Sequence, residues 1–232
     1  MRVARVKMRR PNVIMFKFSY YGSNKEQSIS FEGIPRDGID HTPRLAWNDV
    51  ASLEDYPADR GSQVAATLMS PLDQNSGIPC AFPTAEFIAA IHRFRERTGA
   101  LIILDDIRAG FRLHPKGSHE AIGLKPDMLC LGKALGNGYS QAALLGTEPL
   151  RSSAEQIHYT STTIFSAVCA RAAIATLNVY ERTQAFDKLT HAGKRLIAGM
   201  EAAATTHGQS IEFSGPVTHP TMLFSGDPNQ AK

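Results

Sequence analysis

The sequence predicts an α/β fold with a mostly parallel sheet flanked by helices. Short apolar runs at residues 64–69 and 100–104 are separated by a stretch in which apolar residues follow helical spacing. A strand, a crossover helix and a second strand form a βαβ unit, which favours a right-handed crossover and parallel strands. Further apolar runs at 127–131 and 141–145 extend the pattern. With 232 residues, 43% of them hydrophobic, the chain can form one sizeable core or a domain and a half.

The first ten residues are basic and contain no acid. They could form a transit peptide, but the stretch is short, lacks serine and leads directly into an apolar run at 13–16. A helix with its basic face in solvent, ended by Pro11, is the better interpretation. We expect a loop at 19–23 and a long surface connection at 24–49, because the latter is rich in Gly, Pro and polar residues.

The middle and last parts of the chain contain the clearest helix signals. Asn48 and Asp49 precede a short acidic helix around Leu53, and Thr84 can cap a helix that ends at Gly99. Alanine-rich helical patterns follow at 164–180 and 184–205. The second of these patterns predicts a buried stripe formed by Leu189, Leu196, Ile197 and Met200. A final strand is expected at 221–224.

Composition excludes several classes of protein. The net charge of +3 is spread over both signs, without the basic and aromatic clusters of a nucleic-acid surface. Cys80, Cys130 and Cys169 are odd in number and lack Cys-x-x-Cys spacing, which argues against a disulfide framework or a zinc site. No apolar run approaches the roughly 18 residues of a membrane span. We therefore expect a soluble cytoplasmic protein that binds neither membranes nor nucleic acid.

An acid and a lysine each follow an apolar run, where open α/β sheets bind ligands. Lys133 lies among glycines and could form a Schiff base with a carbonyl, although a surface lysine in a turn is an equal alternative. Asp105 ends a strand and needs a partner, either a protonated pyridine nitrogen or simply Arg108 or Arg112. Asp105 and Asp106 could also ligate magnesium, but nothing completes the cluster, so no metal is expected.

Two further groups could contact a ligand. Tyr20 and Tyr21 follow a strand and offer flat faces for stacking on an aromatic ligand, with ordinary packing as the alternative. The run at 158–163 places hydroxyl groups before a helix, where they could bind an anion or simply cap the helix.

Together these motifs resemble the class III pyridoxal-phosphate-dependent aminotransferases, including the glutamate-1-semialdehyde aminomutase group. The resemblance rests on Asp-Asp-Ile-Arg-Ala-Gly-Phe-Arg after a strand, on Gly-Lys-Ala-x-Gly-x-Gly after the next one, and on a threonine before an alanine-rich helix. It extends from Arg2 to about Phe224. It implies a fold-type-I large domain, incomplete, at 1–205, and the start of a truncated carboxyl-terminal small domain at 206–232.

The resemblance also implies roles for individual residues. Lys133 is similar to the lysine that forms a Schiff base with pyridoxal 5'-phosphate and then moves a proton. Asp105 would pair with the pyridinium nitrogen and keep it protonated. Tyr20 matches an aromatic residue that stacks on the ring, with Tyr21 beside it. Asn75 resembles an asparagine near the cofactor's phenolic oxygen.

Thr162, with Thr163 as the alternative, resembles a threonine that reaches the phosphate across a dimer interface, which implies a homodimer. The implied function is amino transfer between an amine or amino acid and a 2-oxo acid or aldehyde, both small molecules. One alternative is intramolecular amino transfer, as in the aminomutase. Another is an inactive remnant of the fold.

The sequence also departs from the family pattern. Asp106 stands where most members have Glu, and Tyr21 replaces the His of a Tyr-His-Gly motif. Ser70 precedes Pro71 where Glu-Pro is usual, and Arg108 replaces a Gln or a Met. The family's Ser-Gly-x-Glu-Ala phosphate loop would lie before Met1. These differences leave the subgroup open.

Overall fold

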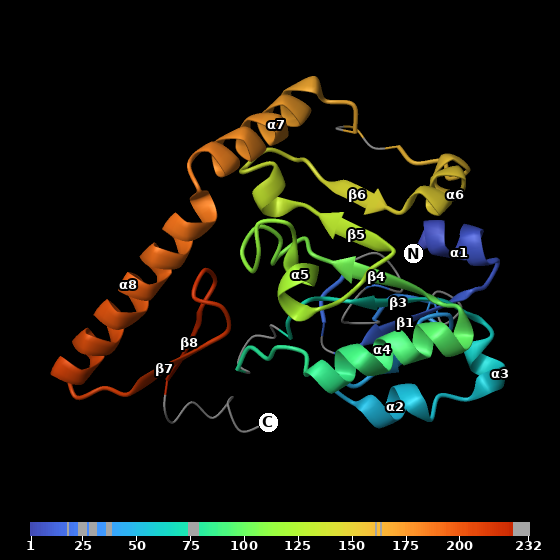
Figure 1. Ribbon diagram of the computed structural model, residues 1–232, viewed down its shortest axis with the longest axis horizontal. Helices are drawn as coiled ribbons and strands as arrows, with labels where there is room; N and C mark the ends of the chain where they lie inside the picture. Colours follow the sequence, from blue (N-terminus) through green and yellow to red (C-terminus); the bar gives the residue numbers. More distant parts are fainter. Residues whose placement is uncertain are drawn as a thin grey trace.

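The computed structural model describes residues 1–17, 19–22, 27, 32–35, 39–73, 79–160, 162 and 164–224. Their centre is a six-stranded sheet with the order β2-β1-β3-β4-β5-β6 (Figure 1). All neighbouring strands are parallel except β6, which runs antiparallel to β5. The mostly parallel α/β fold is therefore confirmed. The strands are β1 (Asn12–Phe16), β2 (Arg44–Leu45), β3 (Val64–Met69), β4 (Leu101–Asp105), β5 (Met128–Leu131) and β6 (Ala143–Gly146).

Helices cover both faces of this sheet (Figure 1). On one face, Phe87, Ile91 and Phe94 of α4 pack with Leu53 of α2 against buried strand residues. On the other face, Val3 of α1 and the buried Leu150 pack against strand residues that include Ile103. The helices are α1 (Arg2–Met8), α2 (Val50–Glu54), α3 (Ala58–Gly61), α4 (Ala85–Thr98), α5 (Ser118–Ile122), α6 (Arg151–Glu155), α7 (Ala167–Arg182) and α8 (Ala185–Thr206), with 3-10 turns η3 (Lys133–Leu135) and η4 (Glu148–Leu150).

Several helix ends follow the local signals in the sequence. The Thr84 hydroxyl accepts a hydrogen bond from the Phe87 N–H at 3.1 Å, and Gly99 ends α4 with a φ of 74°. Asp49 caps α2 by accepting from the Ser52 N–H at 3.1 Å. α1 ends at Met8, three residues before Pro11, with Arg9 in the left-handed region. These predictions succeed because caps depend on neighbouring residues only.

The prediction of a buried stripe on α8 is wrong. No residue of this helix is buried; Leu189 is 44% exposed and Leu196 is 54% exposed. The helix continues from the end of α7 and extends away from the sheet, and it contacts α7 and β7 (Ile211–Ser214) (Figure 1). An apolar stripe shows that one face of a helix avoids water, but it does not identify the surface that covers the face.

Two short strands, β2 and β7, were not predicted from the sequence. β2 pairs in parallel with β1 inside the segment expected to be only a surface connection. β7 pairs antiparallel with β8 (Thr221–Phe224) and forms a second, two-stranded sheet. Strands this short contain too few residues to establish an alternation. Within the described part of the chain, no helix is both long and apolar enough to cross a membrane.

Asp127 links α4 to the amino-terminal end of β4. Its carboxylate lies 2.7 Å from the Arg95 guanidinium of α4 and accepts the Ile102 N–H of β4 at 2.8 Å. Asp127→Ala would leave that buried N–H without a partner, which costs about 1–3 kcal/mol. We expect the melting temperature to fall by several degrees in thermal denaturation followed by circular dichroism. Glu148→Ala, which removes an exposed ion pair, is the control, and an equal melting temperature for both variants would contradict the assignment.

Candidate functional site

Four of the residues expected at the site line one pocket at the carboxyl ends of the parallel strands. This pocket has a volume of ≈ 160 Å³ and includes Tyr20, Tyr21, Asp105 and Lys133. The loops after β1, β3, β4 and β5 supply its walls, which explains how residues distant in sequence meet. The expected crevice between Asp105 and Lys133 is therefore present. Its remaining lining residues are Ser19, Gly22, Ser70, Pro71, Leu72, Ile107, Arg108 and Ala109.

Asp105 is the last residue of β4 and lies opposite Cys130 of β5 in the sheet. Its carboxylate accepts the Ile107 N–H at 3.2 Å. Loss of solvent raises the pKa of Asp105 from 3.8 to about 6, against the opposing effects of this hydrogen bond and of the Lys133 charge. The cation that acts on Asp105 is the Lys133 ammonium, which lowers its pKa. The carboxylate therefore faces the pocket that it shares with Lys133.

Lys133 opens the η3 turn directly after β5 and is exposed. Its φ of 41° lies in the left-handed region, which a non-glycine residue rarely adopts. The turn is closed by hydrogen bonds from the Leu135 N–H to the Gly132 carbonyl at 2.9 Å and from the Asn137 N–H to the Lys133 carbonyl at 3.1 Å. Backbone strain of this kind concentrates at functional sites, and here the hydrogen bonds of the turn hold Lys133 in this conformation.

The two tyrosines differ more than their adjacency in sequence suggests. Tyr20 is 61% exposed, so its ring can lie against a ligand. Tyr21 is only 6% exposed and packs in the core cluster that contains Val13 and Met15. Burial raises the pKa of the Tyr21 hydroxyl. Tyr20 can therefore stack on a bound group, whereas Tyr21 forms part of the fixed wall.

The remaining candidates lie elsewhere. Asn75 and Thr163 are outside the described residues. Thr162 is exposed and is not among the residues that line the pocket. The described residues contain no group of three or more His, Cys, Asp or Glu side chains that could hold a metal ion.

Sequence reasoning missed several walls of the pocket. Ser19, Leu72, Ile107 and Ala109 line it without a distinctive chemical pattern. Only their position in the chain could have indicated that these four residues line the pocket, because each lies within a few residues of the carboxyl end of a parallel strand.

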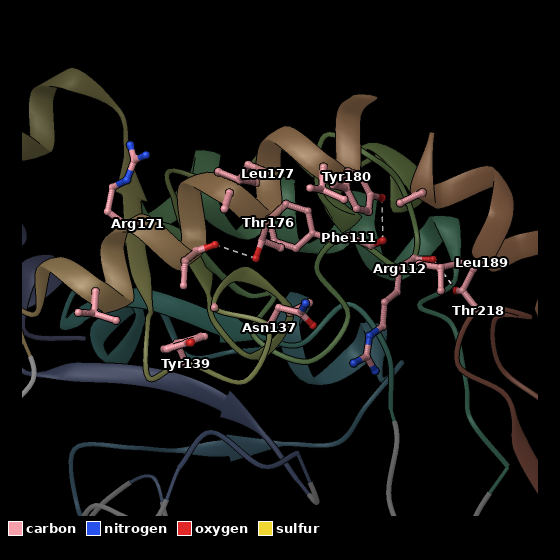
Figure 2. A pocket seen from close by; sticks show the side chains of 17 residues that line it. Phe111, Arg112, Asn137, Tyr139, Arg171, Thr176, Leu177, Tyr180, Leu189 and Thr218 are labelled. Carbon is pink, nitrogen blue, oxygen red and sulfur yellow. Dashed lines mark hydrogen bonds between the residues drawn. The ribbon is translucent and has the colours of Figure 1, made fainter. Parts of the chain in front are cut away.

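A larger cavity of ≈ 970 Å³ lies apart from this chemistry, between α7, α8 and the η3 turn (Figure 2). Most of its lining is apolar, and the Tyr180 hydroxyl beside it donates to the Phe111 carbonyl at 2.8 Å. Neither Asp105 nor Lys133 lines it. The smaller pocket, which contains both, is therefore the candidate active site.

Comparison with known proteins identifies one family. The family model described as aminotransferase class-III matches residues 4–215. An aminopentol aminotransferase of Sphingopyxis macrogoltabida is 33% identical over 98% of this chain and 54% of its own length. A glutamate-1-semialdehyde 2,1-aminomutase of Polynucleobacter necessarius is 31% identical over 79% of this chain and 43% of its own length.

Solved structures show the same fold. The PLP internal aldimine form of the FumI protein of Sphingopyxis sp. MTA144 superposes with a TM-score of 0.93 at 33% identity, covering 98% of this chain and 55% of that one. An omega-transaminase from Sphaerobacter thermophilus gives a TM-score of 0.85 at 20% identity, covering 98% of this chain and 56% of that one. The chain thus spans about half the length of the relatives it matches. The family match covers nearly all of the strands and helices around the pocket, and the chain belongs to the class-III aminotransferase family.

Proposed function

We propose that this chain carries out pyridoxal-phosphate-dependent amino transfer, with Lys133 and Asp105 as its catalytic residues. The observation that supports this most directly is their meeting in one pocket at the ends of adjacent parallel strands. The residues present fit the cofactor: a partly buried acid with a pKa raised to about 6 suits a cationic ring nitrogen, and an exposed lysine suits its aldehyde. When bound, pyridoxal phosphate supplies an electron sink for a developing carbanion.

Each side chain then has a distinct task. The Lys133 amine would hold the cofactor covalently and would afterwards accept and return the substrate proton. The Asp105 carboxylate would accept a hydrogen bond from the ring nitrogen and keep the proton there. Tyr20 would stack on the ring, with Tyr21 in the pocket wall beside it. Asn75 would be the partner of the phenolic oxygen, as the family resemblance implies.

The substrates we propose are a small amine or amino acid as donor and a 2-oxo acid or aldehyde as acceptor. Intramolecular amino transfer is the second candidate, since an aminomutase is among the relatives at 31% identity. The two reactions differ in one requirement. A mutase forms product without an added amino acceptor, whereas a transaminase does not.

Covalent trapping tests the proposal without relying on turnover. Purified protein mixed with pyridoxal phosphate should develop an absorption band at the edge of the visible region. Borohydride reduction followed by peptide mass mapping should then locate the added mass on Lys133. Failure to form the band would refute the proposal for this chain and would favour an inactive remnant of the fold.

We also propose a homodimer in which Thr162 of one chain contacts the phosphate bound by its partner. The exposed position of Thr162, outside its own chain's pocket, supports this role. Light scattering should give a mass near twice 25.3 kDa. Thr162→Ala should weaken cofactor binding without changing that mass, and a strictly monomeric chain that binds cofactor equally well with or without Thr162 would contradict the role.

The proposed organisation places the cofactor-binding large domain at 1–205 and the start of a small domain at 206–232. The separate β7–β8 sheet after α8 supports that division. A cytoplasmic location is proposed on the cysteine spacing, which offers no disulfide framework.

A further inference from the structure

We propose that Asp106 is a positioning residue that holds the wall of the pocket and sets Asp105 against Lys133. This inference rests on the proposed function for its catalytic consequence. Asp106 directly follows Asp105 but is completely buried, whereas Asp105 is partly exposed at the pocket. The two neighbouring acids therefore have different environments and different tasks.

The backbone of Asp106 joins the ends of the two catalytic strands. Its N–H donates to the Cys130 carbonyl at 3.0 Å, which extends the β4–β5 pairing one residue beyond Asp105. Its carbonyl accepts the Gly110 N–H at 2.8 Å and closes a turn. That turn presents Ile107, Arg108 and Ala109 to the pocket. Cys130 lies three residues before Lys133, so the Asp106–Cys130 bond links the segment after Asp105 to the strand that leads to Lys133.

The side chain of Asp106 contacts the end of the loop that follows it, at Ser118. Its Oδ2 accepts the Ser118 N–H, at the start of α5, at 2.9 Å. A side chain at position 110 could not be accommodated, because its Cβ would lie 2.6 Å from the Asp106 carbonyl oxygen and 3.4 Å from Oδ2. The loop between Asp106 and Ser118 is thus tied at both ends to one residue.

The Asp106 carboxyl group lies where solvent is excluded. Oδ1 of Asp106 and the Ser118 hydroxyl are buried without a hydrogen-bond partner among the described residues. Loss of solvent raises the pKa of Asp106. An acceptor oxygen, rather than a negative charge, is what the Ser118 N–H requires. Asparagine should therefore replace this aspartate, whereas alanine should not.

Asp127 provides a matched control. Its carboxylate also accepts a buried backbone N–H, that of Ile102, but at the opposite end of the parallel strands. Asp106→Ala and Asp127→Ala each remove one buried carboxylate–backbone bond. A purely structural role for Asp106 predicts the same consequences for both variants. A positioning role predicts that only Asp106→Ala disturbs the pocket.

The experiment compares the wild-type chain with Asp106→Ala, Asp106→Asn and Asp127→Ala. We expect Asp106→Ala to shift the absorption band of bound pyridoxal phosphate, to weaken its binding and to lower turnover by up to about 100-fold, the scale of a misplacement near 1 Å. Asp106→Asn should restore the band and the affinity. Asp127→Ala should retain both. If Asp106→Ala does not fold, Asp106→Glu, which lengthens the side chain, should give the band shift in reduced degree.

A second readout uses the protein without cofactor. Amide hydrogen exchange at residues 107–118 should be faster in Asp106→Ala than in Asp127→Ala and unchanged in Asp106→Asn. Equal exchange and equal cofactor affinity in the two alanine variants would overturn the inference. If wild type forms no cofactor band, the proposed function fails, and the exchange comparison still decides whether Asp106 holds the turn.

Discussion

Replacing Lys133 with alanine is expected to abolish the covalent adduct with pyridoxal phosphate and the amino-transfer activity. The amine is lost as the group that binds the cofactor's aldehyde and as the group that moves the proton. Loss of general acid–base catalysis alone lowers a rate by about 10²–10⁴-fold. The absorption band should vanish, and borohydride reduction should leave no added mass on the peptide that contains position 133.

The fold should tolerate this change. Lys133 is exposed, and alanine at a φ of 41° bears the same backbone strain as lysine. We expect the free energy of unfolding to change by less than about 0.5 kcal/mol, as for other surface substitutions. Lys125→Ala, at an exposed lysine before β5, is the matched control and should keep the band. A band that survived in Lys133→Ala would assign the adduct to another amine.

The parts of the site that follow from topology could be predicted from the sequence. Asp105 and Lys133 each follow an apolar run, and parallel strands bring such positions to one edge. This inference needs only the alternation of strands and helices. It does not require knowledge of side-chain contacts, which explains its success.

Features that depend on distant contacts could not be predicted. Tyr20 and Tyr21 are equivalent in the sequence and both line the pocket, yet Tyr21 is buried in a core cluster whereas Tyr20 is 61% exposed. The apolar stripe of α8 is real, but no core of the described chain covers it. In the sequence, Asp106 could only be interpreted as a possible metal ligand beside Asp105. Its actual partner, Ser118, lies twelve residues away across a loop without regular periodicity, so the sequence does not indicate their contact.

Replacing Asp105 with asparagine is expected to stabilise the cofactor-free chain while impairing its chemistry. In the folded chain the pKa of Asp105 is about 6, against 3.8 as its ordinary value. Between these values the folded chain binds more protons than the unfolded chain, so this residue lowers stability as the pH rises. At pH 7 the loss is fully present and amounts to roughly 1–3 kcal/mol. Asparagine avoids it and can keep the hydrogen bond from the Ile107 N–H.

Urea denaturation without cofactor should therefore find Asp105→Asn more stable than wild type at pH 7, by an amount that shrinks as the pH falls toward 4. With cofactor bound, wild type should be the better catalyst of the two. A neutral amide cannot hold the ring nitrogen protonated, so turnover should fall roughly 100-fold or more, the scale of a lost electrostatic contact in a transition state. The Lys133 adduct should persist in part. Near-wild-type turnover in Asp105→Asn would refute the assignment of this acid, whereas a gain in stability with a loss of turnover is the signature of a carboxylate kept for its ligand.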